Sequence, residues 1–373
     1  MVAEFHISAS FPALATGTGM NHDFDPTLPL ERAHTIPNTW YFDPARAERE
    51  RAAVFAGWQA VGRLDQVPGP GSFFTADIAG EPVAVLRDGD GTLRAFHNVC
   101  RHRAAPVLCE PCGTAAKLRC RYHGWTYDLT GRLRGAPEFE GVADFDRADF
   151  GLTPMAVDAW GPTVWVHPAA PHRPLSTVLA PLPERTMTRI ANLRWQARRS
   201  YDLACNWKVY VDNYLDGGYH INYVHPGLAG ALDYSQYRTE LFDHGNVQIS
   251  PLKQADDAAV SSVRTGDVAM YWWIFPNFMV NLYSGVMDTN LVLPLGPESC
   301  RVIFDFYFAE GTDAAFVDQS VAVAEQVQQE DISICEDVQR GLHSRSFSTG
   351  RFSVKRENGG YQFHQLLAAA VSG

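Results

Sequence analysis

The chain has 373 residues, of which 46% are hydrophobic, 12% aromatic and 20% charged, and its formal net charge is −11. This composition is typical of a folded globular protein and excludes a disordered chain. The diffuse acidic balance disfavours nucleic acid or an anionic membrane surface as a partner. The sequence shows neither a secretory leader nor an apolar stretch of about 18 residues, so it predicts a cytoplasmic protein without a membrane span.

The N-terminal half divides into segments that differ in composition and in predicted secondary structure. Residues 1–38 lack periodicity and are expected to form an arm over the surface. Asp43–Trp58 begins with a helix-capping residue and Pro, followed by good helix formers, and predicts a helix. From about 58 to 168, short β-branched runs alternate with turn signals, which predicts a small antiparallel β domain. The Pro-rich residues 170–190 are expected to be a connector.

The C-terminal half mixes strand and helix signals. Residues 206–220, which read NWKVYVDNYLDGGYH, predict a helix, and Phe316–Leu342 predicts a second, long one. Between them, the apolar runs around residues 268–309 predict strands of one antiparallel sheet. Strands beside helices without regular βαβ alternation indicate the α+β fold class.

Two pairs of metal-ligating residues lie where hairpin tips are expected: Cys100 with His102, and Cys120 with His123. Four ligands on one structural zinc ion is one interpretation. The other is a Rieske 2Fe–2S cluster, with two Cys on one iron and two His on the other. Each predicted hairpin tip carries one Cys and one His, and the flanks NVCRHRAAP and CRYHGWTYDLTGRL resemble the Rieske signature. Both observations favour the cluster. Cys109 and Cys112 between the pairs are expected to be inert loop thiols.

A second metal site is indicated further along the chain. His220 and His225 are five residues apart, which on an ideal helix places them about 140° apart. Pro226 disfavours helical geometry at His225, so that side chain can turn back toward His220. Two imidazoles and one carboxylate form the facial triad of non-heme Fe(II) oxygenases.

The carboxylate is expected from the long C-terminal helix, which offers two Asp residues. Asp331 shares a helix face with the apolar residues Val327 and Ile334, where a carboxylate needs a partner such as a metal ion. Asp337 lies with Glu330 on a polar face, where a solvated charge is the simpler interpretation. The pattern therefore predicts Asp331 as the iron ligand and leaves Asp337 as the alternative.

Together these motifs resemble the oxygenase alpha subunit of a Rieske non-heme iron oxygenase, and within that group the choline monooxygenase type. The resemblance rests on the two cluster segments and on NWKVYVDNYLDGGYHINYVHPGL, FPNFMVNLY, MDTNLVLPLGP and EDISICEDVQRGL. It implies a Rieske domain over 58–168, inserted into a helix-grip-like catalytic domain with an antiparallel sheet over 169–373. Residues 1–57 then form an arm and a helix packing on the catalytic domain. A head-to-tail homotrimer is implied, in which one subunit's cluster feeds its neighbour's iron.

The resemblance also implies a reaction. A separate reductase or ferredoxin supplies electrons, and NAD(P)H acts only through it, since no G-x-G-x-x-G dinucleotide motif follows a strand. Fe(II) and O₂ then hydroxylate a C–H bond of a small quaternary or tertiary ammonium compound, choline-like or betaine-like, by N-demethylation or carbinol oxidation. An aromatic-ring hydroxylating oxygenase is the main alternative. A Rieske electron carrier without chemistry of its own is disfavoured by the second metal site.

One position departs from the family pattern. Many members carry a bridging Asp or Glu three residues before the first iron His, but here that position is Gly217 and Asp216 stands one residue earlier. If the helix continues, Asn213, Asp216 and His220 share one face. Asp216 is then expected to couple the two metal centres, with Asn213 beside it. The alternative is a solvent-facing charge at the end of the helix.

Aromatic residues crowd the segments expected near the iron, and aromatic faces hold methylated ammonium groups through cation–π attraction. The candidates for a substrate pocket are Tyr219, Tyr223, Tyr271, Trp272, Trp273, Phe275 and Tyr283. Strand alternation places Trp272 on one sheet face and Tyr271 and Trp273 on the other, so only one set is expected to line the pocket. Ordinary sheet-core packing is the alternative for at least half of them.

Overall fold

The computed structural model describes residues 24–253 and 258–372 of the chain. The fold is α+β, as predicted, and each strand pair in the described part is antiparallel. Part of the predicted N-terminal arm, residues 1–23, lies outside the described residues. Within the described part, no helix has the length and apolar character needed to cross a membrane.

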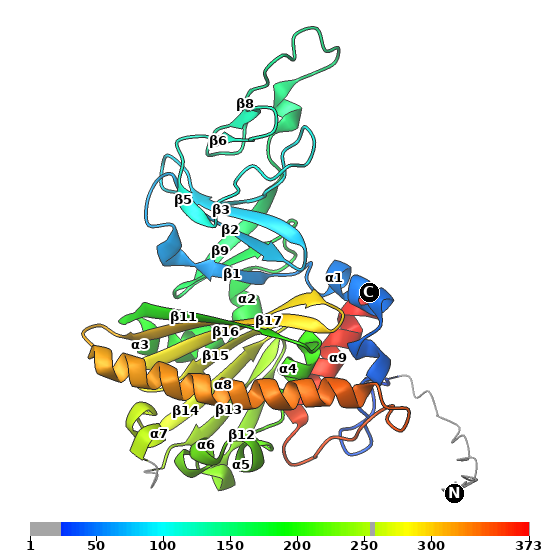
Figure 1. Ribbon diagram of the computed structural model, residues 1–373, viewed down its shortest axis with the longest axis vertical. Coiled ribbons are helices and arrows are strands. Elements are labelled where there is room, and N and C mark those ends of the chain that lie inside the picture. The colour runs from blue at the N-terminus through cyan, green and yellow to red at the C-terminus, as the bar shows by residue number, and fades with distance from the viewer. Residues whose placement is uncertain (1–23, 254–257, 373) are drawn as a thin grey trace, which may run out of the picture.

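The first half of the chain forms one seven-stranded and one three-stranded sheet. In spatial order the larger sheet holds β1 (Gln59–Arg63), β10 (Thr163–His167), β9 (Pro154–Trp160), β4 (Leu93–His97), β3 (Glu81–Arg87), β2 (Ser72–Ile78) and β5 (Cys112–Thr114). The smaller sheet holds β6 (Leu118–Arg119), β7 (Thr126–Tyr127) and β8 (Leu133–Gly135). Figure 1 shows that the smaller sheet and its loops lie at the end of the molecule remote from the second half of the chain.

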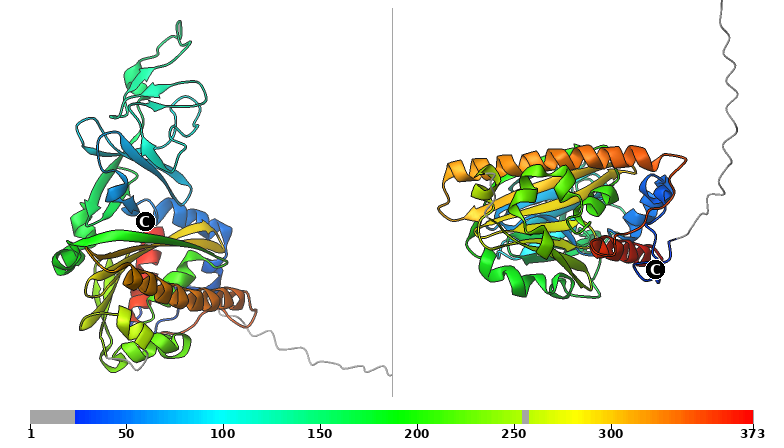
Figure 2. Two further views of the ribbon diagram at one scale, coloured as in Figure 1. Left: turned by 60° about the vertical axis from the view of Figure 1, so that its left-hand side comes forward. Right: turned by 90° about the horizontal axis from the view of Figure 1, so that it is seen from below.

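The second half builds another seven-stranded antiparallel sheet. In spatial order it holds β11 (Leu193–Leu203), β17 (Ser299–Ala309), β16 (Val286–Gly296), β15 (Phe278–Leu282), β14 (Val268–Ile274), β13 (Gly245–Pro251) and β12 (Arg238–Phe242). The predicted long helix is confirmed as α8 (Ala314–Leu342), which runs across one face of this sheet (Figures 1 and 2).

The predicted N-terminal helix is confirmed as α1 (Pro44–Ala53), capped by Asp43 and shorter than expected. It packs near α4 (Trp207–Tyr214) and α9 (Asn358–Ser372) of the second half. A buried ion pair between Glu50 Oε2 and Lys208 Nζ, 2.7 Å apart, links α1 to α4. Residues before and after the first β domain therefore pack together, so the β domain is an insertion into the fold of the rest of the chain.

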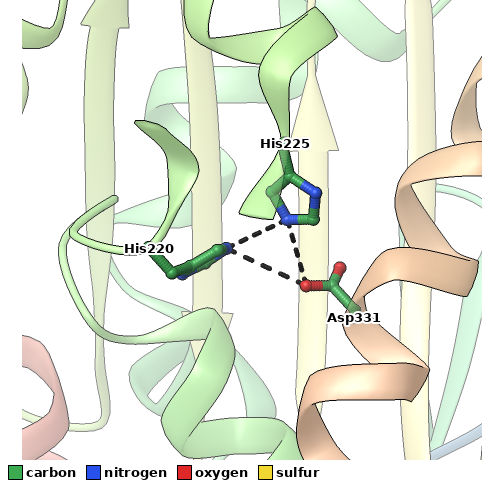
Figure 3. Close-up of side chains that lie close together, drawn as sticks. All are labelled: His220, His225 and Asp331. Atoms are coloured by element: carbon green, nitrogen blue, oxygen red, sulfur yellow. Dashed lines mark hydrogen bonds and ion pairs between the residues drawn. The ribbon is translucent and has the colours of Figure 1, made fainter. Parts of the chain in front are cut away.

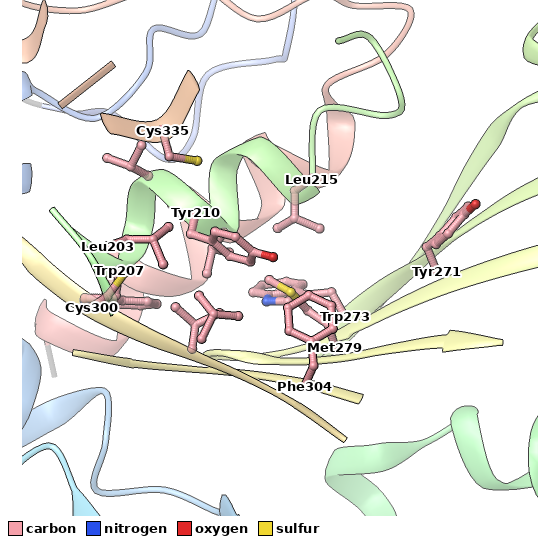
Figure 4. Close-up of a cluster of buried hydrophobic side chains, with 14 of the residues drawn as sticks. Leu203, Trp207, Tyr210, Leu215, Tyr271, Trp273, Met279, Cys300, Phe304 and Cys335 are labelled. Atoms are coloured by element: carbon pink, nitrogen blue, oxygen red, sulfur yellow. The ribbon is translucent and has the colours of Figure 1, made fainter. Parts of the chain in front are cut away.

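The sheet of the second half separates two hydrophobic cores, because side chains alternate between its two faces along β14. Trp273 lies in the core that also holds Trp207, Tyr210 and Phe304 (Figure 4). Trp272 faces the opposite core, which holds residues from the β1–β10 sheet and from α2 (Leu175–Leu179) and α3 (Leu182–Ile190). The Pro-rich connector is therefore not an extended linker, because its two short helices fill the space between the sheets.

The helix predicted over residues 206–220 is wrong in its C-terminal part. It ends at Tyr214, and Gly217 and Gly218 follow with φ of +70° and +74°. These left-handed conformations interrupt a right-handed helix and suit glycine, which has no Cβ. The chain then forms α5 (Ile221–Val224) and α6 (Pro226–Ala231), with α7 (Ala258–Val263) further on.

Candidate metal centre

Three side chains, two from the residues flanking α5 and one from α8, converge on one point (Figure 3). His225 Nε2 lies 3.1 Å from His220 Nε2 and 3.1 Å from Asp331 Oδ1, and His220 Nε2 lies 3.8 Å from the same oxygen. Two atoms bound about 90° apart on one ion at about 2.1 Å lie about 3 Å apart. The spacing of His220, His225 and Asp331 therefore suits three ligands on one face of a single metal ion.

The local fold explains how two histidines five residues apart meet. His220 precedes the first residue of α5, and His225 follows its last residue. His225 has φ −118° and ψ 74°, outside helical geometry, and Pro226 begins the next helix. This is the predicted effect of a proline on the residue before it, and it brings both imidazoles to the same side of the turn.

A second layer of polar side chains fixes the orientation of the three ligands. His220 Nδ1 donates to Asp216 Oδ2 at 2.7 Å, and His225 Nδ1 donates to Glu330 Oε2 at 2.7 Å. Asn213 Nδ2 donates to Asp331 Oδ1 at 2.7 Å. Both imidazoles therefore direct an Nε2 lone pair at the convergence point, the tautomer that a metal ion requires.

The residues present fit a divalent metal ion. Two nitrogen lone pairs and a carboxylate oxygen directed at one point repel one another unless a cation lies between them. Burial would lower the pKa of His225, but the carboxylates of Asp331 and Glu330 raise it, which shows how negative the surroundings are. The donor set of two imidazoles and one carboxylate is the facial triad of non-heme iron sites.

The structure changes the expected position of Asp216 and separates the two candidate carboxylates. Asp216 does not share a helix face with Asn213 and His220, because α4 has already ended; a turn brings it to His220 instead. The backbone N–H of His220 also donates to Asp216 Oδ2, at 2.9 Å. Asp337 lies away from the centre, with an exposed side chain paired with Arg340.

Glu330 is a site residue that the sequence pattern assigned to a solvated polar face. Its side chain is 25% exposed and reaches His225 across the edge of that face. Adjacent residues on a helix point about 100° apart, so Glu330 and Asp331 reach the two edges of one imidazole from neighbouring positions. The adjacent Glu330-Asp331 pair is the signal in the sequence from which this arrangement could have been predicted.

Glu330→Gln is expected to lower the iron affinity of the catalytic domain by about 10-fold to 100-fold while leaving the fold and the cluster spectrum intact. The amide weakens the hydrogen bond that holds His225 in its metal-binding tautomer. Iron retained after dialysis against a graded series of chelator concentrations measures the effect. Glu325→Gln is the matched control, because Glu325 lies on the same helix but pairs with Arg199. Equal iron retention in both variants would contradict this role.

The four predicted cluster ligands lie on two similar loops. The N–H of Cys100 donates to Ala105 O at 2.8 Å, and the N–H of Cys120 donates to Trp125 O at 2.8 Å. The fourth residue after each Cys, Ala104 and Gly124, has positive φ, at 59° and 74°. The two loops thus present one Cys and one His each in matching turns.

The environment of these four residues fits a 2Fe–2S cluster. Cys100 and Cys120 are buried, and burial raises the pKa of the Cys120 thiol. His102 stacks on Trp125 at 5.0 Å, and its buried Nδ1 has no hydrogen-bond partner among the described residues. An unpartnered imidazole nitrogen beside two buried thiols matches the mixed ligands of a Rieske centre. The other loop thiols, Cys109 and Cys112, are exposed and unbridged.

A cavity of about 100 Å³ lies beside His220 and Asp331. Aromatic side chains in its wall are Tyr210, Tyr214, Tyr237, Tyr271, Tyr283 and Phe304. Tyr271 and Tyr283 were among the predicted pocket residues, and the hydroxyl of Tyr283 donates to that of Tyr271 at 3.0 Å. Figure 4 shows Tyr271 apart from the packed cluster that contains Trp273.

The other five predicted pocket aromatics do not line this cavity. Tyr219 and Tyr223 are 48% and 81% exposed, because the turn before α5 and α5 itself present them to solvent. Trp272 lies on the opposite face of the sheet. Trp273 packs against Phe275 and α9 in the core, so the side of the sheet alone does not decide which aromatic reaches the cavity.

Comparison with known proteins agrees with both centres. The family model of the Rieske [2Fe-2S] domain matches residues 57–146, and that of the ring hydroxylating alpha subunit catalytic domain matches residues 190–373. The chloroplastic choline monooxygenase of Arabidopsis thaliana is 39% identical, over 97% of this chain and 89% of that protein. The carnitine monooxygenase oxygenase subunit of Escherichia coli is 28% identical, over 91% of this chain and 94% of that protein.

Solved structures give the same result. A quaternary ammonium Rieske monooxygenase in complex with an inhibitor superposes with a TM-score of 0.83 at 28% identity, covering 92% of this chain and 98% of that one. Naphthalene 1,2-dioxygenase from Rhodococcus sp. shares the fold, with a TM-score of 0.76 at 18% identity over 91% of this chain and 94% of that one. The resemblance inferred from the motifs is therefore confirmed: the chain belongs to the Rieske non-heme iron monooxygenases, as an oxygenase alpha subunit.

Proposed function

We propose that the chain is the terminal oxygenase component of a system that hydroxylates a C–H bond of a small quaternary or tertiary ammonium compound, with electrons from a separate reductase. The observation that carries the proposal is a small tyrosine-lined cavity directly beside the three iron ligands. The similar choline and carnitine monooxygenases, and a related structure that holds L-carnitine, support this substrate class.

The cavity wall suits a methylated ammonium group. Such a group has no N–H to donate, so aromatic faces bind it through cation–π attraction, worth about 1–2 kcal/mol for each desolvated contact. Tyr237 and Tyr271 lie nearly parallel, with 14° between their planes, and Tyr283 meets Tyr271 edge to face. A volume of about 100 Å³ is small beside the roughly 300–1,000 Å³ of pockets for drug-sized ligands.

Each residue of the site has a defined task in this reaction. Fe(II) held by His220, His225 and Asp331 supplies the oxygen activation and C–H hydroxylation when it is bound. Asn213 fixes the carboxylate of Asp331 through its amide N–H. Asp216 and Glu330 hold the Nδ1 protons of the two histidines, which leaves both Nε2 atoms free for the metal.

The proposal includes electron transfer between subunits of a head-to-tail homotrimer. The cluster loops and the iron site lie at opposite ends of the molecule (Figure 1). The electron path to this iron site is therefore shorter from the cluster of a neighbouring subunit than from the cluster of the same chain. Asp216 is the proposed link, because its carboxylate contacts the iron ligand His220 and also lines a second cavity, which His220 does not line. Inter-subunit electron transfer is described for a related quaternary ammonium Rieske monooxygenase, which supports this arrangement. A cytoplasmic location stays a prediction, since the plant relatives are named as chloroplastic.

Asp216→Asn is expected to preserve iron content and to slow oxidation of the reduced cluster by at least about 10-fold when substrate and O₂ are added. The amide removes the charge that links His220 to the neighbour's cluster. Single-turnover absorbance of the cluster follows the rate. Asp202→Asn is the control, because Asp202 is an exposed carboxylate paired with Arg301. An unchanged rate in Asp216→Asn would remove Asp216 from the electron path.

The proposed substrate class is tested by coupled O₂ consumption with choline and with its neutral isostere tert-butylethanol. The two molecules have nearly the same shape and differ in the charge of the quaternary centre. Cation–π binding predicts productive turnover of the cation and at least about 10-fold weaker use of the isostere. Equal use of both would refute the ammonium assignment and favour hydroxylation of a neutral aromatic substrate.

A further inference from the structure

The wall of the cavity beside the iron ligands contains an amide side chain that is paired at one end only. Gln328 lies on α8 one turn before the iron ligand Asp331, and both residues line this cavity. Only 2% of Gln328 is exposed, and its Oε1 accepts a hydrogen bond from the hydroxyl of Tyr210 at 2.7 Å. Its buried Nε2 has no hydrogen-bond partner among the residues that the structure describes. A buried donor without an acceptor is costly, which points to a group that binds there.

The other amide side chains of this wall differ from Gln328 in this respect. Four of them line the cavity and donate through their NH₂ groups to acceptors of the protein: Asn213, Gln248, Asn281 and Asn290. Their acceptors are the carboxylates of Asp331 and Asp288 and the carbonyl oxygen of Tyr214. Within the described part of the wall, Gln328 is therefore the amide whose NH₂ group is free for a ligand.

The position of Gln328 is fixed by its helix and by Tyr210. Ala324, Val327, Gln328 and Asp331 line the cavity at successive offsets of three, one and three residues, which places them along one stripe of α8. Tyr210 comes from α4 and occupies Oε1. The planar amide cannot turn without losing that hydrogen bond, so its NH₂ group is held in one orientation.

The acceptor that suits this NH₂ group is a neutral oxygen atom. An amide has no net charge, so it can pair with a hydroxyl oxygen, whereas a buried carboxylate needs an opposite charge beside it. Asp331, one turn further on α8, is itself an anion and would repel a carboxylate at this position. The local chemistry therefore favours a hydroxyl group.

We infer that Gln328 is a substrate-binding residue, whose amide NH₂ group donates to a hydroxyl oxygen of the substrate beside the iron ligands. This inference rests on the proposed function and deepens it, because it adds a second recognition element to the ammonium group. The two elements belong to different walls of the cavity. Gln328 lies on α8, whereas Tyr271 lies on β14 and Tyr283 directly follows β15. A substrate that carries both groups spans the cavity with its hydroxyl end toward α8.

Calorimetric binding to the oxidised holoenzyme, without reductase, measures this contact apart from turnover. The ligand pair is choline and propyltrimethylammonium, which share the quaternary centre and differ in that a methyl group replaces the hydroxyl. We expect the wild type to bind choline at least about 10-fold more tightly, because the alkyl ligand leaves the buried Nε2 without an acceptor. The extra apolar surface of the alkyl ligand acts in the opposite direction, which makes the comparison strict.

Gln328→Met is expected to reduce the preference for choline to within about 2-fold, because methionine has a similar length and no NH₂ group. Tyr210→Phe keeps the amide but frees its Oε1, so it is expected to retain part of the preference and guards against a folding defect in the first variant. Gln329→Met is the matched control, since Gln329 is the next residue on α8 and is exposed. It is expected to keep the full preference. Iron content and the cluster spectrum verify the fold of each variant.

The outcomes separate this inference from the function on which it rests. Equal binding of both ligands by the wild type overturns the role of Gln328 and leaves the ammonium substrate intact. The same holds if Gln328→Met weakens both ligands by one factor, because a purely structural role of Gln328 would have that effect. If neither ligand binds the wild type, the proposed ammonium substrate and this inference fail together.

Discussion

Asp331→Ala is expected to abolish mononuclear iron binding and to reduce activity by more than about 100-fold, while the visible spectrum of the cluster is unchanged. The variant removes the carboxylate whose Oδ1 lies 3.1 Å from His225 Nε2 and leaves two imidazoles to hold the ion. It also leaves the amide of Asn213 without its acceptor. Metal analysis of the purified protein gives three irons per chain for the wild type and two for the variant under this interpretation.

Asp337→Ala is the matched control for this prediction. Asp337 lies further along the same helix, nearer its C-terminal end, and keeps an exposed pair with Arg340, which contributes little to stability. It is expected to retain iron and activity. If Asp337→Ala lost the third iron and Asp331→Ala kept it, the assignment of the iron carboxylate would be reversed.

The convergence of His220, His225 and Asp331 was predictable because short-range geometry determines most of it. A proline disfavours helical geometry at the residue before it, so the sequence around Pro226 predicted that His225 leaves the helix. The apolar periodicity of α8 likewise predicted that Asp331 faces inward. Neither inference depends on which distant residues pack nearby, and the structure brings His220, His225 and Asp331 to one point.

The contacts that orient the ligands were less predictable, because they depend on where helices end. Helical periodicity placed Asn213, Asp216 and His220 on one face, but α4 ends before Asp216 and the turn supplies the contact instead. Glu330 was assigned to solvent because helical periodicity alone does not account for the reach of a long side chain across a helix edge. The prediction of the pocket aromatics was wrong for a similar reason: Trp273 and Tyr271 share a sheet face and the same core, yet only Tyr271 also lines the cavity.

The chain has Gly217 where many family members carry a carboxylate, and this difference has a steric explanation. Gly217 has φ +70°, and a Cβ there would overlap the carbonyl oxygen of Arg356 and lie 2.8 Å from its carbonyl carbon. Both atoms belong to backbone, so a rotamer change cannot relieve the contact. A carboxylate side chain therefore does not fit at the usual family position, and the chain carries it at Asp216, whose Oδ2 still reaches His220.

Gly217→Ala is consequently expected to destabilise the protein by at least about 3 kcal/mol, from left-handed strain and backbone overlap together. Gly311→Ala measures the left-handed strain without the backbone overlap, because Gly311 has φ +84° but open space where a Cβ would lie. That control is expected to cost only about 1–2 kcal/mol. Denaturant midpoints of the catalytic-domain transition, read by tryptophan fluorescence, measure both.

The same steric explanation can be tested more strictly by moving the carboxylate from position 216 to position 217. The double variant Asp216→Asn with Gly217→Asp restores the spacing common in the family, yet it is expected to be less stable than Asp216→Asn alone and not to recover its electron-transfer rate. The overlap with Arg356 displaces the turn that carries the new carboxylate toward His220. Recovery of a wild-type single-turnover rate in the double variant would show that the turn can shift, and that backbone packing does not fix the carboxylate at Asp216.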